Sequence, residues 1–238
     1  MIRLTNVAKD YPSNHGIRRI LYNINLTIQP GERIGILGRN GAGKSTLIRL
    51  ISGAEPPTEG TIERHMSVSW PLAFSGGFQG GLTGADNVRF ICRIYGVDYH
   101  PRFKFVQEFS ELGTYLNEPV STYSSGMRAR LAFAISMTVD FDCYLIDEVM
   151  AVGDHSFRER CRVELFEKRR DKSKLIVSHS HRYLKGNCDR FLLFRNGTIE
   201  EHSDFDEVYY QYKQQIGEGF ETRELMARVI TDDPQMSV

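Results

Sequence analysis

The chain has 238 residues, with 30 basic residues balanced by 30 acidic ones, so its formal net charge is zero. This balance argues against nucleic acid or a charged lipid surface as a direct partner. Four scattered cysteines without a C-x-x-C pair indicate reduced thiols in a cytosolic compartment rather than disulfides or a metal site. No segment approaches the ~18–20 apolar residues of a membrane span, and the N-terminus lacks the apolar core of a signal peptide.

Residues 1–70 predict a strand-rich start. Turn signals at 12–16 and 29–31 separate alternating apolar segments, and the residues after the third segment have helical spacing. The expected strands are Ile2–Val7, Ile20–Ile28, Arg33–Leu37, Thr61–Arg64 and Ser67–Trp70, and the expected helix is Thr46–Ile51.

The rest of the chain is first helical and then alternates between strands and helices. A glycine-rich hinge at 75–81 leads into a helical segment from Asp86 to about Val139, and strands return at 143–146, 175–177 and 191–194. Beyond Gln214 the chain is polar, and we expect a partly helical, loosely held tail. The pattern predicts an α/β fold with a strand-rich start, a helical insert and βαβ units around a parallel sheet.

The segment Gly38–Ser45 matches the phosphate-binding pattern G-x-x-x-x-G-K-[ST]. A strand precedes it and a helix follows, so its glycine-rich turn exposes successive N–H groups beside a helix N-terminus, which favours phosphate. Lys44 is placed to reach the β- and γ-phosphates, and the Ser45 hydroxyl is placed to ligate Mg²⁺. The chain is therefore expected to bind a nucleoside triphosphate.

Two carboxylates, Asp147 and Glu148, end the apolar strand that begins at Cys143. At that end of a parallel sheet, Asp147 is placed to hold Mg²⁺ through water and Glu148 to polarise the attacking water as a general base. His179 follows another apolar strand and is placed to contact the γ-phosphate. Acidic pairs after strands are common and single histidines are usually surface or core residues, so each motif gains weight only from the others.

The turn Tyr123–Met127 directly precedes a helical segment at 128–136. Two hydroxyls and a glycine at a helix N-terminus make another anion site. Taken alone, Ser124 or Ser125 is equally well a simple N-cap. The turn gains meaning because all four motifs occur in one order around a helical insert.

With these motifs, the sequence from Ile2 to about Tyr210 resembles the ATP-binding cassette (ABC) family, whose ATPase subunits drive membrane transporters. The resemblance implies a P-loop NTPase with a RecA-like core and an antiparallel β subdomain at 1–85 and 140–214. It further implies a helical subdomain at 86–139 and a tail at 215–238, with ATP and Mg²⁺ as cofactors and ATP hydrolysis as the activity.

The resemblance assigns roles to single residues. Tyr11 would stack on adenine, Asp147 would be the Walker B aspartate, Glu148 the catalytic glutamate and His179 the switch histidine, and 151–154 would be the D-loop. The Walker A residues that would bind the nucleotide, with Lys44 also catalytic and Ser45 also a metal ligand, are Gly38, Arg39, Asn40, Gly41, Ala42, Gly43, Lys44, Ser45 and Thr46.

The turn at 123–127 occupies the family's signature position but departs from the L-S-G-G-Q pattern. It keeps the second-place serine, Ser124, and the fourth-place glycine, Gly126. The first, third and fifth places of the pattern hold Tyr123, Ser125 and Met127 instead. Because Ser124 and Gly126 are the groups expected near the γ-phosphate, the resemblance implies a working composite site formed by Ser124, Ser125 and Gly126.

The Q-loop is a second departure. Gln79 precedes the segment 82–87 by fewer residues than the family's glutamine precedes its L-T-x-x-E-N segment, and Phe74 or Ser75 lies nearer the expected place. By resemblance, Gln79 is assigned as a ligand of Mg²⁺ or of water.

The family geometry implies a homodimer in which ATP bound by 38–46 of one copy is capped by 124–126 of the other. A separate transmembrane permease, in two copies, would dock on the face at about 74–95, so the protein is expected at the cytoplasmic face of the bacterial inner membrane. The apolar residues there form either a docking groove or ordinary core: Phe74, Phe78, Phe90, Ile94 and Tyr95.

Three segments, at 36–46, 82–84 and 147–154, resemble the polysaccharide-exporter branch of the family. Val149 stands where most cassettes have proline. The chain ends soon after its last strand, so we expect it to lack the carbohydrate-binding tail of some O-antigen exporters. The resemblance favours capsular polysaccharide as the cargo, handled by the permease. Teichoic acid or tail-less O-antigen export remains open.

Three other functions fit parts of the sequence. A cassette ATPase that acts on DNA or ribosomes would carry a coiled-coil insertion or a second cassette, and neither is present. A P-loop kinase for a small metabolite would use Lys44 and Ser45 but leave Glu148, His179 and the 124–126 turn without roles. An inactive scaffold would not need Lys44, Asp147, Glu148 and His179, and the sequence contains all four.

Overall fold

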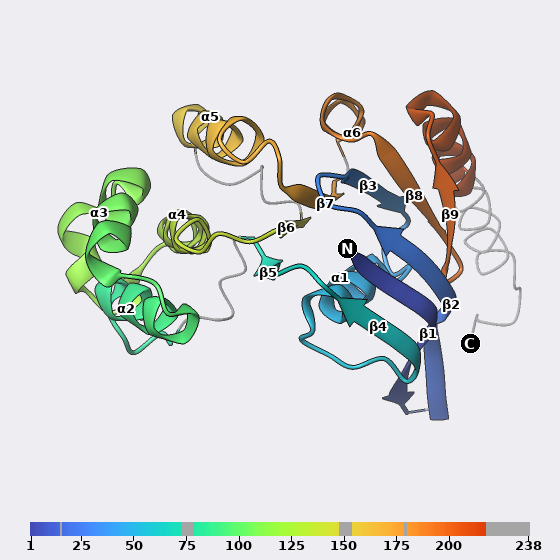
Figure 1. The fold of residues 1–238 in the computed structure, drawn as a ribbon, viewed down its shortest axis with the longest axis horizontal. Coiled ribbons are helices and arrows are strands. Elements are labelled where there is room, and N and C mark those ends of the chain that lie inside the picture. The colour runs from blue at the N-terminus through green and yellow to red at the C-terminus, as the bar shows by residue number, and fades with distance from the viewer. Residues whose placement is uncertain (15, 73–78, 148–153, 179, 218–238) are drawn as a thin grey trace, which may run out of the picture.

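The computed structural model describes residues 1–14, 16–72, 79–147, 154–178 and 180–217, and they form an α/β fold with two sheets (Figure 1). The smaller sheet is antiparallel, with the strand order β2-β1-β4, and the larger has the order β5-β6-β7-β3-β8-β9. All neighbours in the larger sheet are parallel except β8 and β9. The strands are β1 (Ile2–Ser13), β2 (Gly16–Ile28), β3 (Arg33–Gly38), β4 (Glu59–Arg64), β5 (Val68–Pro71), β6 (Cys143–Asp147), β7 (Ser173–Val177), β8 (Arg190–Arg195) and β9 (Thr198–His202).

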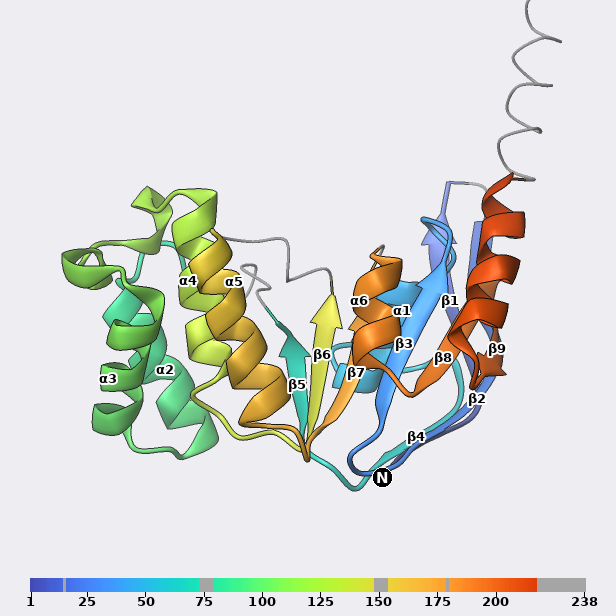
Figure 2. The ribbon, with the colours of Figure 1, turned by 90° about the horizontal axis from the view of Figure 1, so that it is seen from above.

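The helices fall into two groups (Figure 2). Three of them, α2, α3 and α4, form a lobe beyond the β5 edge of the larger sheet, while the others lie against its faces. The helices are α1 (Lys44–Ser52), α2 (Gly84–Tyr95), α3 (Tyr99–Ser110), α4 (Ser125–Ser136), α5 (His155–Arg162), which continues into a π-helical turn at Val163–Glu167, α6 (His181–Asn187) and a last helix at 205–217.

The larger sheet is buried on both faces, which is why its central strands read as continuous apolar runs. In β6, Cys143 and Leu145 pack with α1 and the smaller sheet, whereas Tyr144 and Ile146 pack with α5, α6 and the helical lobe. Figure 1 shows α1 held between the two sheets. The loop at the start of α1 is therefore supported by core on both sides.

The structure confirms the predicted fold class and the predicted strands and main helices, with three differences. β1 continues to Ser13, past several irregularities in its pairing with β2, so Tyr11 lies in a strand. α2 begins at Gly84, because the Thr83 side chain caps it by accepting from the Asp86 N–H. The strand β9 was not predicted.

β9 pairs with β8 through a two-residue turn, and the sequence of this turn is typical of a β-hairpin. Asn196 and Gly197 both have positive φ, 50° and 80°, and Arg195 is paired with Thr198. An Asn-Gly pair is the typical sequence of such a hairpin turn. The signal was present in the sequence and was missed.

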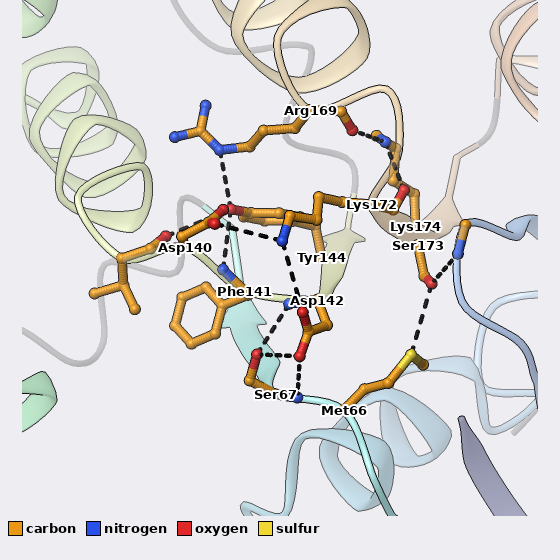
Figure 3. Close-up of polar contacts among 12 residues, drawn as sticks. Met66, Ser67, Asp140, Phe141, Asp142, Tyr144, Arg169, Lys172, Ser173 and Lys174 are labelled. Carbon is orange, nitrogen blue, oxygen red and sulfur yellow. Dashed lines mark hydrogen bonds and ion pairs between the residues drawn. The ribbon is translucent and has the colours of Figure 1, made fainter.

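A partly buried arginine, Arg169, joins the end of the helical lobe to the larger sheet. Arg169 donates to the Met137 carbonyl after α4 at 3.0 Å, to the Tyr144 hydroxyl of β6 at 3.0 Å, and to the Glu164 carboxylate. The Arg169 and Glu164 side chains are only 14% and 6% exposed. Arg169 thereby connects three elements at the point where the chain leaves the lobe, and Figure 3 shows its bond to Tyr144.

Two lysines continue this polar network along the same edge of the sheet (Figure 3). Lys174 is fully buried and donates to the carbonyls of Arg169 and Lys172 at 2.7 and 2.8 Å, and burial lowers the pKa of Lys174 to about 8. Lys172 pairs with Asp140 and Asp142. The segment from the end of α4 to β7 is thus fixed by polar contacts as well as by apolar packing.

Candidate functional site

The loop between β3 and α1 has a backbone that only glycine fits at two positions. Gly43, the N-cap of α1, has φ 111°, and a Cβ there would lie 2.7 Å from Cδ2 of Leu21. Gly38 ends β3, and a Cβ there would lie 2.6 Å from Cβ of Phe194. Any larger residue would therefore need a different loop conformation. The loop passes close to the sheet and arrives at the N-terminus of α1, a favourable place for an anion.

Lys44 is the first residue of α1 and its side chain folds back over the loop. The side chain is 9% exposed, and Nζ donates to the carbonyl oxygens of Gly38 at 2.7 Å and Arg39 at 3.0 Å. The lysine therefore braces the loop and holds its charge inside the turn. A phosphate bound by the loop would meet this ammonium group.

A cavity of about 650 Å³ lies against the loop, a size suited to a small-molecule ligand. It brings together predicted site residues from three separate parts of the sequence. Among the predicted site residues, those that line it are Tyr11, Asn40, Gly41, Gly43, Lys44, Ser45, Thr46 and Asp147.

Asp147 reaches this cavity because of the strand order. Its partner in β7 is Val177, and Val177 also pairs with Ile36 of β3, so the β6 terminus lies one strand away from the loop. Ser45 is exposed and Asp147 half-buried. A hydroxyl and a carboxylate on one cavity are hard oxygen donors, the type that Mg²⁺ prefers. These two residues therefore fit the metal predicted from the sequence.

Tyr11, a residue of β1, lines the same cavity, and its hydroxyl is fixed by two hydrogen bonds. It donates to Glu55 Oε2 at 2.5 Å and accepts from Arg49 at 3.2 Å, and Lys9 Nζ lies 5.1 Å from the ring centroid. The hydrogen bond from Tyr11 is the main cause that lowers the pKa of Glu55. The ring is thus held in place at the cavity, as a stacking platform requires.

The signature turn lies in the helical lobe and does not line this cavity. Ser124 caps α4, its Oγ accepting from the Met127 N–H at 3.2 Å, and Ser124 and Ser125 are exposed. The first-place tyrosine, Tyr123, is buried and donates to the Tyr115 carbonyl, so it anchors the turn.

An ionic cluster that no sequence motif indicated ties the signature helix to α5. Arg130 of α4 pairs with Asp154, the N-cap of α5, and with Glu111 at 3.1 Å, and its guanidinium lies 5.0 Å from the Phe157 ring centroid. Arg160 of α5 completes the cluster through Glu111 at 2.5 Å. The partners are far apart in sequence, so only the fold reveals the contact between the signature helix and Asp154, which directly follows 151–153.

Several predicted residues remain without a structural test. Glu148, His179, Phe74, Ser75, Phe78 and 151–153 lie outside the described residues. Gln79 is exposed, and its backbone N–H donates to Asn87 Oδ1 at 3.2 Å. It does not line the cavity beside the loop, so its role as a ligand stays a prediction. Two further loop residues, Arg39 and Ala42, line a neighbouring cavity instead.

No helix within the described ranges is both long and apolar enough to cross a membrane.

Comparison with known proteins adds three findings. A family model described as ABC transporter matches residues 21–151. The chain is 62% identical to the ATP-binding protein BexA of Haemophilus influenzae, over 90% of this chain and 99% of that protein. It is 59% identical to the capsule polysaccharide export ATP-binding protein CtrD of Neisseria meningitidis, over 89% of this chain and 98% of that protein. Proteins named for teichoic acid or O-antigen export match at 33–39% identity.

Solved structures agree on the fold. The dimeric post-hydrolysis state of the ATP-binding cassette MJ0796, bound to ADP and Pi, matches with a TM-score of 0.73 at 22% identity, over 85% of this chain and 98% of that one.

Proposed function

The chain belongs to the ABC transporter family, and on that premise we propose that it hydrolyses ATP to power export of capsular polysaccharide across the bacterial inner membrane. The observation that carries the cargo assignment is the 59% identity, along nearly the full length of both chains, to a protein named for capsule polysaccharide export. Teichoic acid and O-antigen export are second candidates, supported by relatives of lower identity.

In this proposal the loop at 38–46 binds the triphosphate, Lys44 compensates phosphate charge, and Tyr11 stacks on adenine. Ser45 and Asp147 hold Mg²⁺, which neutralises charge on the phosphates when bound. Glu148 follows the metal-binding aspartate and acts as the general base, and His179 contacts the γ-phosphate. The cavity that joins Tyr11, Lys44, Ser45 and Asp147 supports this assignment.

We infer that the working unit is a homodimer. Among the described residues, Ser124, Ser125 and Gly126 of the signature turn do not line the cavity beside the loop of their own chain. A second copy, related by a two-fold axis, would bring this turn onto the nucleotide. The dimeric state of the solved cassette with the same fold is in keeping with this arrangement.

A membrane permease, one copy per cassette, would dock on α2. Phe90, Ile94 and Tyr95 of this helix are 48%, 57% and 42% exposed, and Leu82 just before it is 39% exposed. Large exposed apolar side chains gathered on one element mark interaction surfaces. The protein would then lie peripherally at the cytoplasmic face of the inner membrane, and the permease would handle the polysaccharide.

Deleting the gene in its source bacterium is expected to abolish surface polysaccharide and to cause the polymer to accumulate inside the cell. Wild-type protein should restore the surface polymer, whereas Lys44→Ala should not, because the loop loses the ammonium that binds phosphate. Staining of surface and intracellular polymer measures the result. Lys213→Ala, which removes an exposed lysine of the last helix, is the matched control and should restore export.

Equal protein levels by immunoblot separate loss of function from loss of protein. Surface polymer that persists in the deletion strain would contradict the export proposal. Loss of surface teichoic acid or O-antigen instead of capsule would move the assignment to those cargos.

A further inference from the structure

Four polar or charged side chains meet at the edge of the cavity beside the phosphate loop. This group, the Tyr11 cluster, consists of Lys9 and Tyr11 of β1, Arg49 of α1, and Glu55, which follows the end of α1. Tyr11 and Arg49 line the cavity, whereas Lys9 and Glu55 do not. Glu55 is 44 residues from Tyr11 in the sequence and belongs to none of the sequence motifs. It therefore reaches the cavity only through its neighbours.

The Glu55 carboxylate is held by both elements that flank it. Its Oε1 lies 2.7 Å from Arg49 Nε, and its Oε2 lies 3.4 Å from Lys9 Nζ. Lys9 is itself anchored, because its Nζ also donates to the Pro56 carbonyl at 2.8 Å. Two cations beside the carboxylate favour its charged form, which is the stronger hydrogen-bond acceptor. β1 and α1 together thus set the position and the charge of this acceptor.

The Tyr11 hydroxyl uses both its donor and its acceptor within the cluster. It donates to Glu55 Oε2 at 2.5 Å and accepts from Arg49 Nη2 at 3.2 Å. A hydrogen bond to a carboxylate is charge-assisted and roughly twice as strong as a neutral one. The hydroxyl lies at the far end of the ring, so these two bonds fix the direction in which the ring extends from β1. A phenylalanine ring at this position could not be held in the same way.

Arg49 joins the ring to the phosphate loop. Its Nη2 donates to the Tyr11 hydroxyl and also to Thr46 Oγ1 at 3.3 Å. Thr46 is the last residue of the loop segment 38–46 and is buried in the first turn of α1. One guanidinium therefore fixes the ring relative to the loop before any ligand binds. Such preorganisation adds to affinity, because less conformational freedom is lost on binding.

We propose that Glu55 is a positioning residue of the nucleotide site. Through the Tyr11 hydroxyl it holds the ring where the base stacks, and so it sets the part of the nucleotide affinity that depends on the base. This inference rests on the proposed function, in which Tyr11 stacks on adenine. Inorganic pyrophosphate resembles the diphosphate of ADP but has no base, so its binding should not depend on Glu55.

The test is a pair of calorimetric titrations of the full chain, one with ADP and one with inorganic pyrophosphate, both with Mg²⁺. Wild type should bind ADP more tightly, because a base stacked on an aromatic ring adds affinity. Glu55→Leu should weaken ADP binding by about fivefold and leave pyrophosphate binding unchanged, since only the acceptor of the Tyr11 hydroxyl is lost. Unchanged pyrophosphate binding also shows that the phosphate loop is intact.

Tyr11→Phe provides the reciprocal test, because it keeps the ring and removes the hydroxyl. It should weaken ADP binding about as much as Glu55→Leu does. The double variant should be no weaker than either single variant, since both substitutions remove the same hydrogen bond. Fully additive effects would overturn the proposal. The matched control is Glu63→Leu, the same substitution at an exposed carboxylate of β4 outside the cluster and the cavity, which should leave both affinities unchanged.

Tyr11→Ala separates this inference from the proposed function. Without the ring, ADP should bind little better than pyrophosphate. If Tyr11→Ala keeps the wild-type preference for ADP, the stacking role fails and the positioning role fails with it. If Tyr11→Ala loses the preference while Glu55→Leu or Tyr11→Phe keeps it, only the positioning role is overturned. Equal losses of ADP and pyrophosphate affinity in Glu55→Leu would likewise overturn it.

Discussion

Replacing Glu148 with glutamine is expected to lower the rate of ATP turnover by about 10²–10⁴-fold, the usual contribution of a general base. The variant should still bind ATP, because glutamine keeps the size of the side chain and leaves Lys44, Ser45 and Asp147 in place. Phosphate release measures turnover, and titration with a fluorescent ATP analogue measures affinity. A loss confined to turnover identifies a group that acts in the transition state rather than in binding.

The matched control for this variant is Glu63→Gln. Glu63 lies in β4, is exposed and does not line the nucleotide cavity, so its replacement should leave both turnover and affinity unchanged. Turnover at the wild-type rate in Glu148→Gln would contradict the assignment of the base. Loss of ATP binding in that variant would show that Glu148 acts in the ground state.

Replacing Arg169 with methionine is expected to reduce the free energy of unfolding by about 3–5 kcal/mol. The guanidinium now satisfies the Met137 carbonyl, the Tyr144 hydroxyl and the Glu164 carboxylate. Its loss leaves Glu164, which is 6% exposed, with Lys168 as its remaining ion-pair partner. Urea denaturation measures the change.

Removing Glu164 as well provides the control for this prediction. In Arg169→Met with Glu164→Leu the buried carboxylate is gone, and replacing both members of a buried pair by apolar groups is often nearly neutral. Most of the lost stability should therefore return. A double variant that is less stable than Arg169→Met would show that the bonds to Met137 and Tyr144, rather than the ion pair, carry the effect.

The ion pair also predicts a pH dependence. Burial raises the pKa of Glu164, but hydrogen bonds from Lys168 and Arg169 outweigh it and hold the pKa below its ordinary value of 4.5. A depressed carboxylate pKa contributes stability above the unfolded-state value, and this contribution is lost as the pH falls through the folded-state value. The stability difference between wild type and Arg169→Met should therefore shrink as the pH drops below about 4.5.

The phosphate loop and its neighbours could be predicted because their geometry is local. Glycines at fixed spacing between a strand and a helix define the loop, and the order of parallel strands brings Asp147 to Lys44 and Ser45. Tyr11 could be placed only by resemblance, since nothing in the sequence shows that β1 carries it past its bulges to that cavity.

Contacts between distant segments could not be predicted. Arg130 lies in the signature helix, but the sequence does not indicate that it meets Glu111 and Asp154, because the pairing depends on how the lobe packs against α5. The same holds for the neighbouring cavity lined by Arg18 and Arg195, which lies where β2 meets the turn between β8 and β9, with a hydrogen bond from the Tyr22 N–H to the Gly197 carbonyl. The β9 hairpin is different, since its Asn-Gly turn was readable from sequence.

The central claim, that ATP joins two copies through the signature turn, is tested most directly by the mass of Glu148→Gln in solution. Light scattering with saturating Mg-ATP is expected to give twice the mass found without nucleotide, because ATP that cannot be hydrolysed holds the dimer closed. Adding Ser124→Arg, which places a bulky cation at the turn, should return the mass to that of one chain. A single-chain mass for Glu148→Gln with ATP bound, or a dimer unaffected by Ser124→Arg, would contradict the composite site.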